Sequence, residues 1–463
     1  MLESALVKLL GYGVFWSRHS RNRFRANTLR RILSVEKFIV HSSLKPVPRV
    51  EGERLIERRV LIFRIPVFIR RRQRTKYRVA LLVDEFFGGW DTAIGGYGAL
   101  ARKYICRFIP NDEIQIDLLL NIHGGMKTQQ KLVDQTMIYR LPGPTLERQK
   151  WLDKQAYNLF LSIEMTAASF KILSEYESNA HLLYWIQDPR DLKMYQSRLK
   201  SVNRIKDYDW DYIKDVSAWI QEMMRLKRVS FISQGESLSA IAREMYQIPE
   251  VMPIQDVANP VEIDFDYRLN DPPKENRIIF LGRLEAQKRV WIVCEIAKAM
   301  PHLEFFILGA TGKGRDEVAN AKTLEPYRNP DGSSKIRNLH FTGHVDGNVK
   351  NHHIKAAKLV LNTSFWEGIP VSWLEALSYG TLIVSAFDRD NIVQRFGTFV
   401  GEVMGDGTEE ADIKRFTAAI EYWMRHDSER NATAQKAIEF VRNRHSIAAF
   451  TNQMRTSILC EIQ

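Results

Sequence analysis

The stretch TSFWEGIPVSWLEALSYG, residues 363–380, decides the fold prediction. A short apolar run, KLVLN, precedes it, and Gly368 and Pro370 separate that run from the helix-forming residues VSWLEAL. We therefore predict a strand, a tight turn and a helix, with Glu367 on the turn and Glu375 in the helix. A helix start presents free N–H groups that favour an anion such as a diphosphate, and carboxylates can accept hydrogen bonds from hydroxyl-rich ligands. An ordinary amphipathic helix with exposed glutamates is the alternative.

The same stretch and three further segments together remove most of that ambiguity. Residues 367–377, EGIPVSWLEAL, resemble the E-x7-E signature of retaining GT-B glycosyltransferases of family 4. Upstream, FLGRLEAQK (280–288) resembles the G-R-L-x-x-x-K segment of that family. LEFFILGATGKG (303–314) and LHFTGHV (339–345) lie between the two in the family's order. The resemblance implies a GT-B fold, in which two Rossmann-like, doubly wound α/β domains face each other across a cleft.

The same resemblance implies roles for four charged residues. Arg283 and Lys288 would hold the donor diphosphate and stabilise the negative charge that develops on the leaving group. Glu375 would accept hydrogen bonds from the ribose hydroxyls of the nucleotide. Glu367 would contact the hydroxyls of the transferred sugar and face a developing oxocarbenium ion. Neither glutamate is assigned a covalent role, because the family retains anomeric configuration by attack on the same face.

Backbone groups complete the predicted donor site. N–H groups around Gly368, Ile369 and Val371 are expected to meet the phosphates. In the first half of the chain, the loop GGWDTAIGGYG follows a strand, and in the family this loop touches donor phosphate and acceptor. Gly95 and Gly96 are the residues concerned, because glycine lets backbone approach a ligand closely. A plain tight turn is the competing interpretation.

One position departs from the family. Many members have a histidine after the fourth strand of the first domain, where this chain has Gln187 and Asp188. A related subset that includes some rhamnosyltransferases has a similar pair, which favours a deoxyhexose as the transferred sugar. Asp188 could orient the acceptor hydroxyl or take its proton. It could equally cap the following helix.

No cofactor or metal is expected beyond the nucleoside diphosphate sugar that serves as donor substrate. The spacing of Asp207, Asp209 and Asp211 is reminiscent of the metal-binding carboxylates of GT-A enzymes, but the rest of the chain is not of that type. We interpret these three residues as the solvated end of a helix or a turn.

Composition is that of a globular protein of two or three domains. The 463 residues are 45% hydrophobic and 26% charged, which is ordinary for a soluble fold. The three cysteines are far apart and lack metal or redox spacing. No apolar run approaches the length of a membrane-spanning helix, and no cleavable signal is evident. These features favour a cytoplasmic protein and allow a peripheral position on the inner face of the membrane.

The positive charge is concentrated at the N-terminus. The chain has a formal net charge of +12, yet residues 1–78 contain twenty Lys/Arg against five Asp/Glu, so the remainder is net acidic. Within this extension, residues 18–78 interleave arginine with aromatic and branched residues. We favour docking on an anionic membrane surface, where each basic residue contributes about 1 kcal/mol. A protein partner is the next alternative, and nucleic acid is disfavoured because no recognition module accompanies the arm.

Alternating strands and helices predict a parallel sheet in each half. The domains are expected at 1–77 (basic aromatic extension), 78–257 (acceptor domain), 258–445 (nucleotide-sugar donor domain) and 446–463 (a helix crossing back to the first domain). The first strands are expected at 78–87, 115–122, 160–165, 181–188 and 229–234.

The resemblance therefore implies a retaining GT-B transferase. It would move a hexose or deoxyhexose to a saccharide or lipid-linked saccharide acceptor. The alternatives are a non-catalytic GT-B subunit that acts through its basic arm, and a GT-B nucleotide-sugar epimerase or phosphorylase.

Overall fold

A computed structural model describes residues 53–62, 65–74, 77–164, 167–174, 181–190, 192–204, 216–311 and 317–462. The chain divides into two compact units, Met1–Lys76 and Tyr77–Gln463. The basic stretch 18–31, which the sequence singles out, lies outside the described residues.

The first unit contains an antiparallel hairpin that the sequence did not predict. Its strands are β1 (Glu53–Ile62) and β2 (Ile65–Arg74), and Val60 pairs with Val67 in their register. The expectation that the first strand begins near residue 78 is therefore wrong. Arginine clusters within ERLIERRVLI and IPVFIRRRQR hide the period-two alternation by which a strand is recognised.

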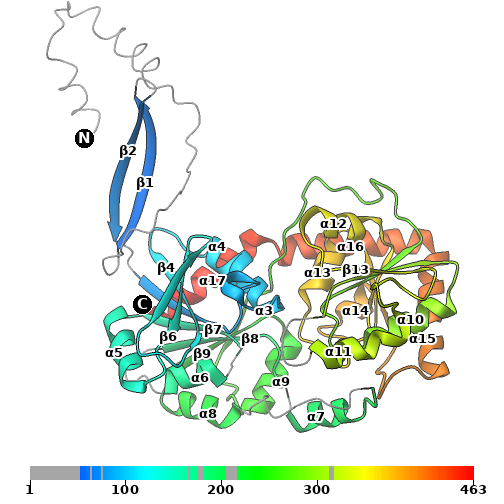
Figure 1. Cartoon of the computed structure of the whole chain (residues 1–463), viewed down its shortest axis with the longest axis horizontal. Coiled ribbons are helices and arrows are strands. Elements are labelled where there is room, and N and C mark those ends of the chain that lie inside the picture. Colours follow the sequence, from blue (N-terminus) through cyan, green and yellow to red (C-terminus); the bar gives the residue numbers. More distant parts are fainter. Residues whose placement is uncertain are drawn as a thin grey trace, which may run out of the picture. The chain divides into compact units, whose positions relative to one another are not determined.

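The first domain of the second unit is built on an eight-stranded sheet (Figure 1). Its strands are β3 (Tyr77–Leu82), β4 (Ile114–Ile122), β5 (Gln129–Val133), β6 (Thr136–Leu141), β7 (Leu159–Ile163), β8 (His181–Ile186), β9 (Val229–Ser233) and β10 (Ile254–Asp256). They lie in the order β10-β9-β8-β7-β3-β4-β6-β5. Every neighbouring pair is parallel except β5 and β6. The predicted parallel sheet is present, with an unpredicted antiparallel edge.

The central strand β3 shows why these segments form the sheet. Val79, Ala80, Leu81 and Leu82 are all fully buried. Ala80 and Leu82 pack into the core on one face, and Val79 and Leu81 pack into the core on the other. A strand covered on both faces is a continuous apolar run rather than an alternating one.

Helices cover this first sheet. A continuous helical segment runs from α3 (Gly96–Ala99) through a π-helical turn (Leu100–Ile105) to α4 (Cys106–Phe108). The others are α5 (Thr145–Gln155), α6 (Ala167–Ser174), α7 (Leu192–Lys200), α8 (Ser217–Arg225) and α9 (Glu236–Tyr246).

The second domain carries a six-stranded parallel sheet. Its strands are β11 (Arg277–Leu281), β12 (Glu304–Leu308), β13 (Leu339–Gly343), β14 (Leu359–Asn362), β15 (Leu382–Ser385) and β16 (Gly397–Phe399). The order β13-β12-β11-β14-β15-β16 is the 3-2-1-4-5-6 order of a doubly wound Rossmann fold. With the first sheet, it gives the GT-B architecture of two Rossmann-like domains.

The helices of the second domain include the one predicted after Pro370. They are α10 (Val290–Ala299), α11 (Glu317–Leu324), α12 (Gly347–Ala356), α13 (Val371–Ser378), α14 (Ile392–Arg395), α15 (Glu410–Arg425) and α16 (Asp427–Arg444).

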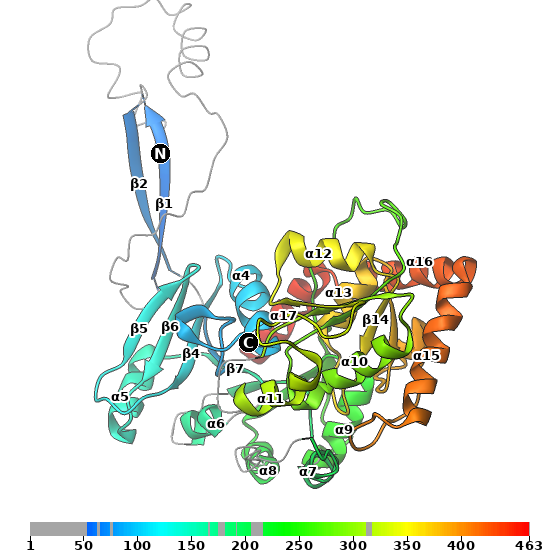
Figure 2. The same ribbon diagram turned by 45° about the vertical axis from the view of Figure 1, so that its right-hand side comes forward.

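The last helix, α17 (Ile447–Ile462), belongs spatially to the first domain. Figures 1 and 2 show α16 beside the second domain and α17 beside the first. Phe450 of α17 stacks on Trp185 of β8, with ring centroids 5.7 Å apart. Met454 and Ile458 are fully buried in the same core.

His445 lies where the chain passes from α16 to α17. It is 1% exposed, and its Nδ1 lies 2.7 Å from the carbonyl oxygen of Asn259 in the linker. Burial lowers the pKa of His445 to about 4. A histidine whose pKa is lower in the folded protein than its usual 6.5 opposes folding as the pH falls between these values.

We therefore expect the free energy of unfolding to fall by about 3 kcal/mol from this residue between pH 6.5 and pH 4. His445→Gln should flatten that part of the curve in urea unfolding at several pH values. The exposed His302 offers the control, since His302→Gln should leave the curve unchanged. An equally steep curve in His445→Gln would show that other groups cause the acid sensitivity.

Candidate active site

Several of the predicted site residues follow strands at the switch points of the two sheets. In a doubly wound sheet the connections diverge at one pair of strands, and ligands bind there, outside the carboxyl ends. In the second sheet this pair is β11 and β14, and Arg283 and Lys288 follow β11 while Glu367 follows β14. In the first sheet the pair is β3 and β7, and Gly95 follows β3.

An ion pair between Lys288 and Glu367 joins the two loops at the second switch point. Glu367 is only 7% exposed, and its Oε1 also accepts a hydrogen bond from Ser364 Oγ at 2.6 Å. Thr363 Oγ1 donates to the carbonyl oxygen of Lys288 at 2.6 Å, which fixes one loop on the other. The two residues that the sequence predicts for donor binding are therefore in direct contact and largely shielded from water.

Arg283 lies among carboxylates. Its Nη1 is 2.8 Å from Glu285 Oε1. The Arg283 side chain is 43% exposed. Partial desolvation would lower its pKa, but the negative charges of Glu285, Glu85 and Glu367 outweigh that effect and raise the pKa above the ordinary value. The guanidinium is therefore held in its charged form at the second switch point.

The start of α13 lies beside this cluster. The helix begins at Val371 after Pro370, which has no side-chain acceptor to cap the first N–H groups. A Cβ on Gly368 would lie 2.1 Å from the carbonyl oxygen of Gln187 in the first domain. Ile369 is buried in the core that both domains share. These predicted donor residues thus lie where the two domains touch.

Glu375 has a cation of its own. Its Oε1 accepts a hydrogen bond from Lys350 Nζ of α12 at 2.7 Å. Lys350 Nζ is also 3.2 Å from Asp346 Oδ1, and Asp346 Oδ2 is 2.6 Å from Lys103 Nζ in the first domain. A chain of alternating charges therefore connects the second turn of α13 to the other domain.

Asp188 bridges the two domains. Its Oδ1 accepts a hydrogen bond from Trp366 Nε1 at 2.7 Å, and its Oδ2 accepts one from Arg190 Nε at 2.8 Å. The following helix, α7, is described from Leu192 onward, and the alternative that Asp188 caps it stays open. Its contact with the residue before Glu367 places it beside the predicted donor loop, and its acceptor role stays a prediction.

Gln187 has a structural role. Its side chain exchanges two hydrogen bonds with the side-chain amide of Asn259, at 2.9 and 3.1 Å. Gln234 Nε2 donates to the carbonyl oxygen of Gln187 at 2.6 Å. Because this amide is 3% exposed and paired within the protein, it does not present a free group to a sugar.

Glu164 holds the backbone of Gln187 and Asp188 in place, and the sequence analysis did not identify it. It follows β7 with a φ of +53°, and its Oε1 accepts hydrogen bonds from the backbone N–H groups of Gln187 (2.6 Å) and Asp188 (2.5 Å). Its Oε2 accepts one from the Tyr184 hydroxyl at 2.5 Å. Burial raises the pKa of Glu164. An acidic residue at the end of the apolar run FLSIEM was the available signal.

Gly95 approaches a carboxylate of the protein itself. A Cβ on Gly95 would lie 2.1 Å from Glu85 Oε2, whereas a Cβ on Gly96 would have no atom within 4 Å. Gly98 N donates to Glu85 Oε1 at 2.8 Å. The close approach of Glu85 thus explains why position 95 is a glycine, whereas a Cβ at position 96 would meet open space.

Asp390 provides a further contact between the domains that the sequence analysis did not identify. It lies after β15, and its Oδ1 accepts a hydrogen bond from Ser237 N of α9 at 2.7 Å. Its Oδ2 accepts one from Glu236 N at 3.1 Å. A carboxylate from the second domain therefore caps a helix of the first, where it also complements the helix dipole.

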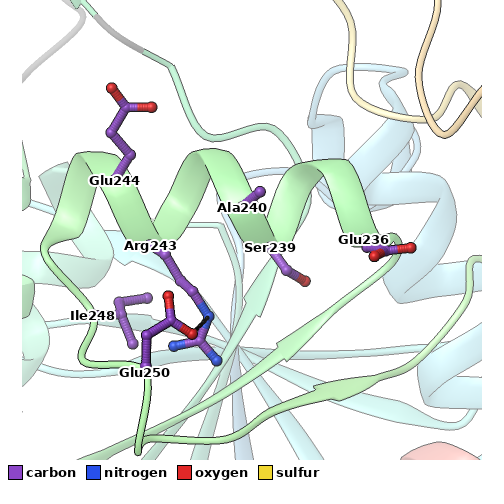
Figure 3. A pocket seen from close by; sticks show the side chains of 7 residues that line it. All are labelled: Glu236, Ser239, Ala240, Arg243, Glu244, Ile248 and Glu250. Atoms are coloured by element: carbon purple, nitrogen blue, oxygen red, sulfur yellow. Dashed lines mark ion pairs between the residues drawn. The ribbon is translucent and has the colours of Figure 1, made fainter.

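A hollow of about 540 Å³ lies away from these residues, on the flank of α9 (Figure 3). None of the predicted site residues lines it. The lining residues are Glu236, Ser239, Ala240, Arg243, Glu244, Ile248 and Glu250. The Arg243 guanidinium is occupied by the carbonyl oxygens of Pro249 and Met252. Acidic side chains predominate there, so the hollow does not suit a diphosphate.

Within the described part of the chain, no group of three or more His, Cys, Asp or Glu is arranged to hold a metal ion. The acidic residues Asp207, Asp209 and Asp211 lie outside the described residues. Independence from metal stays a prediction.

Comparison with known proteins finds a family similarity within the second domain. Residues 263–440 match the family model of glycosyl transferases group 1. Over these residues the second domain is similar to the glycosyl transferases of group 1. Arg283, Lys288, Glu367 and Glu375 all lie within the matched segment. None of the curated protein sequences matches the chain.

Solved structures share the fold over both domains. Sucrose-phosphate synthase from Thermosynechococcus elongatus superimposes with a TM-score of 0.63 at 14% identity, over 82% of this chain and 98% of that one. A glycosyltransferase from Rickettsia africae ESF-5 superimposes with a TM-score of 0.57 at 13% identity, over 84% of this chain and 98% of that one. Anabaena HepE in complex with UDP and glucose superimposes with a TM-score of 0.55 at 11% identity, over 83% of this chain and 100% of that one. At these identities the likeness establishes the GT-B fold.

No helix among the residues that the structure describes is long and apolar enough to cross a bilayer. The cytoplasmic location and the peripheral membrane association both stay predictions.

Proposed function

We propose that this protein is a retaining glycosyltransferase. It transfers a hexose or deoxyhexose from a nucleoside diphosphate sugar to a saccharide or lipid-linked saccharide, and its basic N-terminal extension docks on an anionic membrane surface or a partner. The observation that carries the proposal is the Lys288–Glu367 pair, which is largely shielded from water. It lies, with Arg283, at the switch point of the domain that matches the model of glycosyl transferases group 1. Two proteins of the same fold, a sucrose-phosphate synthase and a protein bound to UDP and glucose, support this class of donor.

The chemistry follows from where charge develops. Breaking the bond between the anomeric carbon and the diphosphate oxygen leaves negative charge on the diphosphate. Arg283, Lys288 and the uncapped N–H groups of α13 would stabilise that charge without reorganising. Glu367 would accept hydrogen bonds from the sugar hydroxyls and Glu375 from the ribose. The acceptor attacks from the side that the diphosphate leaves, so configuration is retained without an enzyme nucleophile or a metal.

Asp188 would orient the acceptor hydroxyl. Its bond to Trp366 Nε1 and its pair with Arg190 fix the carboxylate next to the loop that carries Glu367. A carboxylate with these two partners has lone pairs left for a third hydrogen bond, from the acceptor.

Binding of nucleoside diphosphates tests the donor site directly. We expect one of UDP, GDP, dTDP and ADP to raise the melting temperature of the wild type, because a ligand at a hundred times its Kd adds about 2.7 kcal/mol to stability. In Glu375→Ala that shift should be lost or much reduced, since the ribose hydroxyls lose their acceptor.

Glu304→Ala is the matched control, because Glu304 is exposed on β12 and pairs with a partly exposed histidine, His340, at 2.7 Å. It should respond to the nucleotide as the wild type does. If none of the four nucleotides shifts the wild type, the donor-site proposal fails and the non-catalytic alternative gains support. With the donor known, NMR of the product's anomeric proton decides between retention and inversion.

A further inference from the structure

Glu85 lies at the N-terminal end of the helical segment that begins with α3. Its Oε1 accepts a hydrogen bond from Gly98 N at 2.8 Å, and the N–H of Tyr97 is a second donor to the same carboxylate. Gly95 is tightly packed against Oε2. The N–H groups at this helix start, which could bind an external anion, are therefore bound to an anion supplied by the protein.

The same carboxylate interacts with the donor side of the site. Glu85 and Arg283 attract each other electrostatically across the two domains. Arg283 also pairs with Glu285, and Lys288 pairs with Glu367. Three carboxylates thus interact with two cations, so these five groups have a formal net charge of −1 before any ligand enters.

A capping role explains only part of this arrangement. A carboxylate at a helix start gains from the N–H groups and from the dipole. Capping does not involve an arginine, and the attraction of Arg283, which the proposed function assigns to a diphosphate, adds to it. The combination of helix N–H groups and a guanidinium is the set of donors that binds a phosphate.

We propose that the carboxylate of Glu85 occupies the position of a donor phosphate on the first-domain side, so that Glu85 and the nucleotide sugar compete for Arg283 and for the N–H groups of Tyr97 and Gly98. The inference rests on the proposed function and adds a residue that sets donor affinity. Donor binding then requires Glu85 to turn away or to take up a proton.

Several other titratable groups lie near Glu85. The Glu85→Gln variant separates the contribution of Glu85 to the pH dependence of binding from theirs. Burial raises the pKa of Glu85, against the opposing effects of Arg283 and the Gly98 N–H. The neighbouring acids and hydroxyls are those of Glu285, Glu367, Tyr97, Asp188 and Glu164. His344 of the second domain lies edge-on to Phe87, with ring centroids 6.3 Å apart. Lys103 Nζ lies 4.3 Å from the Phe87 ring centroid.

Calorimetric titration with a nucleoside diphosphate sugar tests the competition. The probe is UDP-glucose, or the corresponding nucleoside diphosphate glucose if another nucleotide raises the melting temperature of the wild type. Such a diphosphate diester does not titrate between pH 5.5 and 8. At pH 8, Glu85→Gln should bind it about tenfold more tightly than the wild type. The wild-type Kd should decrease as the pH falls towards 5.5, and the dependence should be much flatter in the variant, which retains His344 and the other acids.

The amide oxygen that Glu85→Gln introduces can still accept the Gly98 N–H, so the helix start keeps its cap, and the melting temperature of the free variant checks this. Asp84→Asn is the matched control, because it removes the same charge one residue away at an exposed position and should change the Kd less than twofold. The wild-type pH series tests the inference even if Glu85→Gln does not fold.

Two outcomes are separable. If the wild type binds the probe but Glu85→Gln binds no more tightly, or the wild-type Kd is independent of pH, the inference is overturned while the proposed function stands. If neither protein binds any nucleotide sugar, the proposed function fails, and this inference fails with it.

Discussion

Lys288→Met should lower kcat by about 10²–10³-fold, because it removes a preorganised cation from the position where the leaving diphosphate gains charge. Met retains most of the volume of the lysine stem, so the loop is not emptied. Glu367 would be left buried without its partner, which for such a pair costs about 3 kcal/mol of stability. Initial rates at saturating donor and acceptor, with urea unfolding of the same samples, measure both effects.

Lys355→Met serves as the control for the loss of a lysine charge from the second domain. Lys355 pairs with Asp264 at 2.9 Å, and both side chains are partly exposed. Such pairs contribute at most about 1 kcal/mol. Its kcat should stay within a factor of two of the wild type. A near-normal kcat in Lys288→Met would remove this lysine from the catalytic machinery and favour the non-catalytic alternative.

Gly368→Ala should damage both stability and activity through a single methyl group. The added carbon would lie 2.1 Å from the Gln187 carbonyl oxygen and 2.9 Å from Gln234 Nε2. Because the first of these is backbone, relief requires the donor loop and the first domain to separate. We expect a loss of about 1–3 kcal/mol in stability, and about 10²-fold in rate if the reacting groups move by about 1 Å.

The control is Gly124→Ala, in a loop of the first domain where the new methyl group would have no atom within 4 Å. It should be close to neutral in both assays. Calorimetric unfolding, initial rates and small-angle scattering distinguish the outcomes for Gly368→Ala. Unchanged kinetics and an unchanged radius of gyration would show that contact between Gly368 and Gln187 does not set the spacing of the domains.

Much of the second domain could be predicted because its information is local. The apolar run KLVLN became β14, and VSWLEAL became α13 within one residue of the prediction. Fully buried parallel strands are apolar throughout, and the helix boundary is marked by Pro370. The ordered motifs then gave the resemblance to glycosyltransferases, and residues 263–440 match the model of glycosyl transferases group 1.

The missed strands lack such local marks. Asp134 and Gln135 connect β5 to β6, both with positive φ, yet neither is the glycine that commonly signals a two-residue hairpin turn. The three-residue strands β10 and β16 are too short to show any period. In β1 and β2 the arginine clusters hide the pattern.

By itself, the sequence determined the two-domain α/β architecture and the identities of Lys288, Glu367 and the residues around them, because strand burial and helix starts are written in consecutive residues. Only the tertiary structure decided what those residues face. It paired Lys288 with Glu367, set Asp188 on Trp366 and filled the helix start at Gly98 with Glu85. These contacts join segments from 13 to 178 residues apart, and their energies depend on burial and distance, which no local pattern encodes.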